Sequence, residues 1–114
     1  MTILDTSIVI DLVRERKHII EDISVVTLVE YPRIVYYKRF QGNVIFPVEQ
    51  DYLTAHKLQL QLLKKGSPQA FADLLIASIA LNRGERLITR DKDFRVIAEA
   101  ASELGYEFEL ELKT

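Results

Sequence analysis

Short apolar segments alternate with helix-like segments along this chain, and that alternation constrains the fold more than any other feature. The apolar segments, at residues 2–4, 23–26, 44–46 and 86–89, are short and mostly β-branched or leucine, which favours strands. Helical periodicity or a helix-like apolar run fills residues 7–16, 28–40, 49–65, 71–82 and 94–104. Strands that alternate with helices are typical of a parallel sheet covered on both faces. The sequence therefore predicts an α/β fold, a three-layer α/β/α sandwich with a mainly parallel sheet.

Two segments add detail to this prediction. In the longest helical segment, four residues recur on one face: Leu53, His56, Leu60 and Leu63. Near the end of the chain, residues 106–112 alternate strictly between apolar side chains and glutamates. That alternation predicts a half-exposed strand at the edge of the sheet.

Length and composition exclude several classes of protein. With 114 residues, the chain suits one domain spanning 1–114. The absence of cysteine excludes a disulfide framework and a cysteine-bound zinc. No apolar run approaches the ~20 residues of a membrane span, and no signal-peptide pattern is present, so we expect a soluble, cytoplasmic protein. A net charge of −2 argues against binding nucleic acid through bulk positive charge, but basic residues can still line an acidic site.

Acidic residues follow three of the predicted strands. Asp5 follows the first, Glu30 comes shortly after the second, and Asp91 and Asp93 follow the fourth. In parallel sheets, ligands bind at the edge where the strands end. Each acid also has a structural explanation: Asp5 and Asp91 suit helix N-caps, Asp93 suits a first helical turn, and Glu30 completes a capping box that begins at Thr27. The structural and functional roles do not exclude one another.

Asp73 is harder to explain as a structural residue. It lies in the segment 71–77, where apolar side chains surround it in the sequence. A charge on a mostly buried helix costs several kcal/mol unless it is paired or bound to a metal. A salt bridge with a nearby arginine is the structural alternative. The functional interpretation is that Asp73 joins the strand-end acids in one crevice.

A crevice of carboxylates indicates a particular chemistry. Crowded carboxylates repel one another and need a counter-charge, and Mg²⁺ and Mn²⁺ prefer oxygen ligands. A site built only from carboxylates suits phosphodiester hydrolysis, in which the metal activates water and stabilises charge on the phosphate. The basic residues nearest to the acids, Arg90 and Lys92, are candidates for phosphate contacts.

Four segments of the chain resemble, in order, the motifs of the PIN-domain family, and within it the VapC-type toxins of toxin–antitoxin pairs. They are Ile3–Leu12, Ser24–Glu30, Ala72–Ala77 and Leu87–Phe94. The resemblance covers nearly the whole chain and implies a divalent-metal-dependent endoribonuclease that cleaves RNA. It also implies the site residues. The catalytic metal ligands are Asp5, Glu30, Asp73 and Asp91, with Asp93 as an auxiliary ligand and Thr6 and Thr89 as polar supports.

The same resemblance implies partners. An antitoxin could insert an arginine, whose guanidinium pairs with carboxylates and competes with the metal. We expect the apolar flank of that site to be formed by exposed parts of four residues: Ile8, Leu12, Val35 and Tyr36. A homodimer is also expected, because two-fold dimers dominate soluble oligomers.

Two other classes of function remain as alternatives. Receiver and phosphatase domains for phosphoryl transfer also place acids at strand ends, but they need a second acid close behind the first strand, where Thr6 and Ser7 stand. A PIN-like interaction module that has lost its metal is the non-enzymatic alternative. The complete acidic set argues against it.

Overall fold

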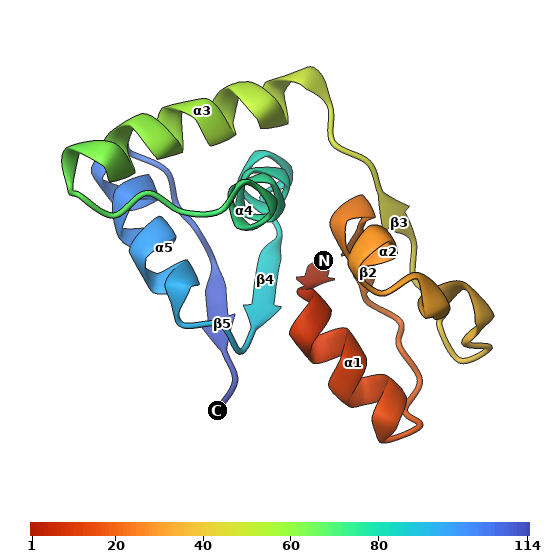
Figure 1. Cartoon of the computed structure of the whole chain (residues 1–114). Helices are drawn as coiled ribbons and strands as arrows, with labels where there is room; N and C mark the ends of the chain where they lie inside the picture. The colour runs from red at the N-terminus through yellow and green to blue at the C-terminus, as the bar shows by residue number, and fades with distance from the viewer.

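A single parallel sheet of five strands, in the order β3-β2-β1-β4-β5, organises the chain (Figure 1). The computed structural model describes residues 1–114 throughout. Its elements are β1 (Thr2–Leu4), α1 (Thr6–Arg14), β2 (Asp22–Ser24), α2 (Val25–Glu30), a 3₁₀ helix η1 (Pro32–Tyr36), β3 (Val44–Ile45), α3 (Glu49–Lys64), α4 (Phe71–Arg83), β4 (Arg86–Thr89), α5 (Asp93–Glu103) and β5 (Leu110–Leu112). All four strand pairs are parallel, as the alternation predicts.

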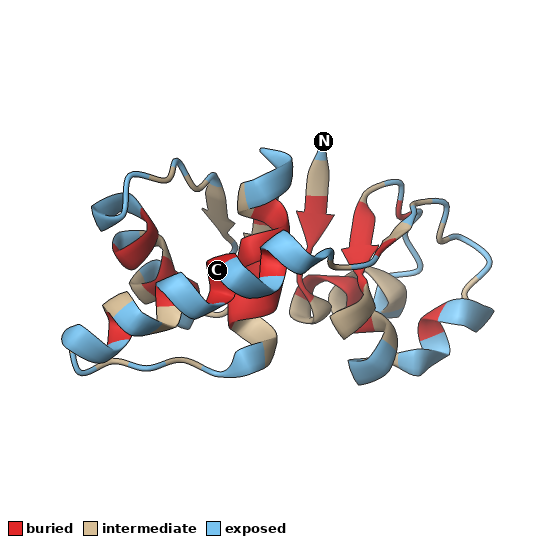
Figure 2. Cartoon of the chain, turned by 90° about the horizontal axis from the view of Figure 1, so that it is seen from above, coloured by how far each residue is buried: buried red, intermediate tan, exposed pale blue.

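Helices cover both faces of the sheet. Consecutive residues of a strand point to opposite faces, and here they enter two separate cores. Ile3 packs in a cluster with residues of α3, α4 and α5, whereas Leu4 packs with residues of α1 and η1. In Figure 2 the buried residues gather in the central strands and in the helices that lie against them. The three-layer α/β/α sandwich is therefore confirmed.

The central position of α4 explains its apolar sequence. Seven consecutive residues, Leu74–Ala80, are buried, because the helix lies between the sheet and α3 (Figure 1). A helix that is apolar all round needs such an enclosed position. Asp73 lies in the first turn of this helix, and this end of α4 reaches the carboxyl edge of the sheet.

The segment from 23 to 40 differs from the sequence prediction. The strand ends at Ser24 rather than at residue 26, and Val25 begins α2. Residues 28–40 do not form one helix. Instead, α2 ends at Glu30 and the 3₁₀ helix η1 begins at Pro32. Proline lacks an N–H group and restricts the residue before it, and Tyr31 accordingly has φ −132° and ψ 69°. The β-branched pattern of residues 23–26 was misleading because tertiary context overrides strand propensity.

Two expectations about exposure also need correction. The face of α3 with Leu53, Leu60 and Leu63 is half exposed, and the helix instead buries Thr54, Ala55, Leu58 and Leu62. Among the four residues expected to flank an arginine site, Val35 and Tyr36 are exposed, but Ile8 is only 7% exposed and Leu12 packs on the second core. Ile8 is buried because α1 turns that side towards the sheet.

The predicted edge strand at 106–112 is present in shortened form. Only Leu110–Leu112 pair with β4, at the edge of the sheet. The alternation upstream is nevertheless real, because Tyr106 and Phe108 pack on the first core while Glu107 and Glu109 are exposed. Across the whole chain, no helix combines the length and the apolar character that crossing a bilayer requires.

Candidate metal centre

Two neighbouring parallel strands place Asp5 and the Thr89–Asp91 segment side by side. In the β1–β4 pair, Leu4 lies opposite Ile88, so Asp5 and Thr89 are the next residues along. The backbone N–H of Asp5 donates to the carbonyl of Ile88 at 2.9 Å. The two strands therefore deliver their following residues to the same point of the carboxyl edge.

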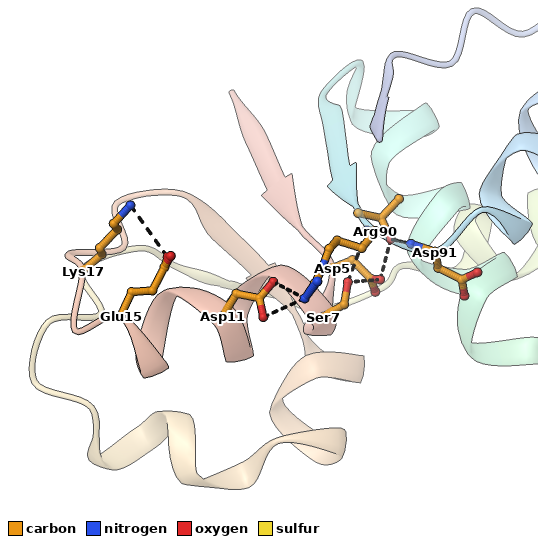
Figure 3. Close-up of polar contacts among 8 residues, drawn as sticks. Asp5, Ser7, Asp11, Glu15, Lys17, Arg90 and Asp91 are labelled. Atoms are coloured by element: carbon orange, nitrogen blue, oxygen red, sulfur yellow. Dashed lines mark hydrogen bonds and ion pairs between the residues drawn. The ribbon is translucent and has the colours of Figure 1, made fainter. Parts of the chain in front are cut away.

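Asp5 is a buried carboxylate held by hydroxyl groups. It is 7% exposed, and its Oδ2 accepts hydrogen bonds from Thr89 Oγ1 at 2.7 Å and from Ser7 Oγ at 3.2 Å (Figure 3). Asp5 stands at the N-cap position of α1, but its side chain makes no capping hydrogen bond. Burial raises the pKa of Asp5 above its usual value, against the lowering effect of these hydrogen bonds, and the nearby charge of Glu30 raises it further.

Glu30 reaches the same region from α2. It is the last residue of α2, and its Oε1 accepts a hydrogen bond from Thr6 Oγ1 at 2.7 Å. The hydroxyl of buried Thr27 lies 2.9 Å from Thr6 Oγ1. Because Thr6 has a single hydroxyl hydrogen, which it gives to Glu30, Thr27 is the donor in that contact. The capping-box interpretation was wrong, since Thr27 lies inside the helix rather than before it.

Asp73 has no hydrogen-bond or ion-pair partner, so the arginine alternative is not observed. Partial burial on α4 raises its pKa to about 6, with further contributions from the charges of Asp91, Asp5, Glu30 and Asp93, in that order. The four other acids named by the sequence analysis therefore all act electrostatically on Asp73.

Asp91 and Asp93 complete the cluster from the β4–α5 connection. The N–H of Asp91 donates to Thr89 Oγ1 at 3.0 Å, and Asp91 Oδ1 accepts from the N–H of Asp93 at 2.9 Å. Asp91 thus supports the start of α5, but Lys92 rather than Asp91 occupies the N-cap position. One carboxylate oxygen each from Asp73, Asp91 and Asp93 lie within 4.8 Å of one another. Asp5 and Glu30 lie outside this tightest group.

The donor set fits a hard divalent cation. It offers only carboxylate oxygens, which Mg²⁺ and Mn²⁺ prefer. Burial contributes most to the raised pKa of Asp73, and the charges of the neighbouring acids add to it. A cation held among them would offset those charges.

Other buried acids show what a structural carboxylate looks like in this chain. Asp22 accepts from the N–H of Asn43 at 2.9 Å, and Asp51 accepts from the N–H of Val48 at 2.8 Å. Buried Glu85 forms an ion pair with Arg83 at 3.2 Å. Each has a fixed partner, whereas Asp73 has only other acids nearby.

Sequence reasoning missed several contacts around the site. It gave no role to Ser7, treated Thr27 as a cap, and did not foresee that Arg90 pairs with Asp11 on α1 at 2.8 Å (Figure 3). The hydroxyl residues carry a weak signal, because Thr and Ser follow Asp5 directly. The Arg90–Asp11 pair carries none, since it joins residues far apart in the sequence.

Solved structures of VapBC proteins have the same fold as this chain. VapBC-1 from nontypeable Haemophilus influenzae matches with a TM-score of 0.72 and 24% identity over 97% of this chain and 96% of that chain. VapBC-5 from Mycobacterium tuberculosis, a member of the VapBC family of toxin–antitoxin systems, matches with a TM-score of 0.72 and 23% identity over 98% of each chain. The chain has the PIN-domain fold. At the level of the fold, the resemblance indicated by the four motifs is confirmed.

A third PIN-fold match is the DNA-bound VapBC from Salmonella typhimurium, with a TM-score of 0.69 and 22% identity over 96% of each chain. No protein-family model matches the sequence, and no curated protein is significantly similar to it. The likeness to PIN domains therefore lies in the fold far more than in the sequence.

Proposed function

We propose that the chain is a VapC-type toxin, a divalent-metal-dependent endoribonuclease that uses Mg²⁺ or Mn²⁺. One observation carries this proposal: Asp73, Asp91 and Asp93 gather within 4.8 Å, beside Asp5 and Glu30, without any cationic partner. The fold supports it, because the matching structures are VapBC proteins. The proposal takes residues 1–114 as one nuclease domain that acts in the cytoplasm.

In this proposal, Asp73, Asp91 and Asp93 hold the metal, with Asp5 and Glu30 as further carboxylate ligands. The bound metal would activate a water molecule and stabilise negative charge on the phosphate. The chain's own residues prepare the site. Thr89 and Ser7 fix the carboxylate of Asp5, and Thr6 fixes that of Glu30. Asp73 is free of hydrogen bonds and can turn towards a cation.

A nucleophilic side chain with a histidine base has no support in the structure. His18 and His56 are both exposed, and neither hydrogen-bonds to an acid of the cluster. Hydroxyl groups near the site are engaged with the carboxylates: Thr6 with Glu30, and Thr89 and Ser7 with Asp5. These residues position ligands rather than attack a substrate.

The test is cleavage of RNA with Mg²⁺ or Mn²⁺, with chelator, and by two variants, Asp5→Asn and Asp73→Asn. Each variant removes a ligand charge with little change of shape, and we expect at least roughly 100-fold slower cleavage. Calorimetry should show weaker metal binding, and the melting temperature of Asp73→Asn should stay similar or rise as repulsion between acids is relieved. Glu107→Gln, at an exposed acid away from the site, is the control. Unchanged cleavage in both variants, or in chelator, would contradict the proposal.

An antitoxin and a second copy of the chain are the proposed protein partners. Exposed apolar side chains support a covered surface on α2, α3 and α4: Val29, Tyr52 and Phe71 are 74%, 47% and 64% exposed. The rings of Tyr52 and Phe71 stack with centroids 6.4 Å apart, so they form one patch. Light scattering should give a dimer mass for the purified chain. A monomer mass would count against the homodimer. Co-expression with a small antitoxin gene adjacent to this one should yield a complex and restore growth, and failure to do so would count against the antitoxin.

A further inference from the structure

Four basic side chains and no acidic one line a groove next to the acid cluster. The groove has a volume of about 470 Å³, and its lining residues are Arg90, Lys92, Arg95, Leu112, Lys113 and Thr114. The chain as a whole has a net charge of −2, so this groove is a local reversal of charge. Like charges brought together repel one another unless an anion binds between them.

The sheet brings the two sides of the groove together. Lys113 follows β5, and its N–H donates to the carbonyl of Thr89 at 2.8 Å, which ties the end of the chain to the end of β4. Lys92 and Arg95 lie at the start of α5, on the other side. The pairing of β4 with β5 therefore fixes Lys113 next to the β4–α5 connection, which carries Arg90 and Lys92.

Two of the four cations are free of acidic partners. Arg90 pairs with Asp11 at 2.8 Å, and Lys113 pairs with Glu111 at 2.6 Å. Lys92 and Arg95 form no ion pair and are exposed. These two side chains can meet an anion without giving up an existing contact.

The β4–α5 connection separates the acids from the cations. Asp91 stands between Arg90 and Lys92 in the sequence, and Figure 3 shows the Arg90 side chain extended towards Asp11 while the Asp91 carboxylate points the other way. A second groove, of about 620 Å³, shares Arg90, Lys113 and Thr114 with the first and continues past them to α1. The lining of this second groove is mixed in charge, because it adds Arg14 and Lys17 but also the acids Asp11 and Glu15. The uniformly basic part is therefore the first groove, beside the residues that flank the acid cluster.

We propose that this basic groove binds the phosphate backbone of the RNA strand whose bond is cut at the acid cluster. The choice of RNA rests on the proposed nuclease function. The groove suits a phosphate chain, because a row of cations tracks a nucleic-acid backbone. It suits a protein partner poorly, since protein interfaces centre on buried apolar or aromatic anchors and Leu112 is the only apolar residue in the lining.

The test measures binding of a short fluorescein-labelled single-stranded RNA to the full chain. Binding is monitored by fluorescence anisotropy, in the presence of chelator and over a range of NaCl concentrations. The variant is Lys92→Gln combined with Arg95→Gln. Loss of two phosphate contacts should weaken binding roughly 10-fold at low salt and reduce the slope of log K against log salt by about 1.4. The control is Lys57→Gln combined with Lys64→Gln, which removes two unpaired cations from a different groove, on α3.

Each outcome separates the groove from the catalytic proposal. If the groove variant loses RNA binding and the α3 control binds RNA as tightly as the parent, the result supports the proposal that the groove binds RNA. This holds even if the parent does not cleave RNA. Equal binding by the parent and both variants overturns it, even if the parent cleaves RNA in Mg²⁺. If the groove variant binds RNA like the parent but no longer binds the antitoxin, the groove is a protein-docking surface and the proposal is wrong. Gel analysis of the RNA after each titration confirms that it stayed intact.

Discussion

Hydroxyl groups decide how the acids of the site are presented. Thr89 contacts both sides of the cluster, because its Oγ1 donates to Asp5 at 2.7 Å and accepts from the N–H of Asp91 at 3.0 Å. It is completely buried, so water cannot replace either contact. Thr6, the first residue of α1, has a comparable role for Glu30. These positioning residues fix ligands that would otherwise have several rotamers.

At the residue scale, we predict that Thr89→Val destabilises the protein and weakens metal binding. Valine keeps the shape but removes the shorter of the two hydroxyl hydrogen bonds to the buried Asp5 carboxylate and leaves the backbone N–H of Asp91 without its partner. These losses cost about 1–3 kcal/mol of unfolding free energy. Valine also removes the hydrogen bond that lowers the pKa of Asp5, so metal affinity should fall roughly 10- to 100-fold. Chemical denaturation and calorimetry measure the two effects. Thr89→Ser retains the hydroxyl and should behave nearly like the parent; equal losses in both variants would contradict the role of the hydroxyl.

Element boundaries determine which acids meet. The parallel β1–β4 pair aligns Asp5 with Thr89, and the early end of α2 at Glu30 places that carboxylate within reach of Thr6. Had residues 28–40 formed one helix, Glu30 would lie in its first turn rather than at the last residue of a short one. Pro32 thus shapes the site through the helix that it ends.

A prediction at the scale of the element concerns the β2–β3 edge. A Cβ atom at Gly42 would lie 1.8 Å from the carbonyl oxygen of Glu21, so Gly42→Ala must displace the chain that leads into β3. We expect a loss of about 1–3 kcal/mol of stability in chemical denaturation. Cleavage per folded molecule should not change, because Gly42 lies at the opposite end of the strands from the acids. Gln41→Ala, at an exposed neighbour, should change stability by less than about 0.5 kcal/mol; a similar loss there would show that the clash is not the cause.

At the scale of the whole molecule, charge is divided between two adjacent regions. Acids gather at the carboxyl edge of the sheet, and basic residues gather beside β5. The net charge of −2 conceals this division. A cation and a polyanion can thus each bind a region of opposite charge on the same protein.

Proton linkage gives a prediction for the whole molecule. The pKa of Asp73 is raised from 3.8 to about 6, so the native state holds this proton more tightly than the unfolded chain does. Without metal, stability should therefore fall as pH rises from about 4 to about 6, by on the order of 1 kcal/mol because Asp73 is partly solvent-screened. A metal must displace that proton, so the rise in melting temperature with Mg²⁺ should be larger at about pH 7 than at about pH 5. Asp73→Asn should lose most of this pH dependence; a metal effect independent of pH in the parent would contradict the linkage.

The sequence by itself determined the α/β class, the parallel sheet and the identity of the candidate acids. Periodicity reports local burial, so it separated helices from strands over most of the chain. The charge of Asp73 within an apolar helix was conspicuous because an unpaired buried charge is costly. Asp5 and Asp91 were conspicuous because each follows an apolar strand.

Only the tertiary structure decided how those residues meet. Strand order and register place Asp5 beside Thr89, and such pairings between distant segments leave no local pattern. The exposed leucine face of α3 has the same cause, since helical periodicity marks a face without saying what covers it. The basic groove joins residues of α5 to residues beyond β5. Which charges end up facing one another depends on packing over the whole chain, and periodicity in a short window does not contain that information.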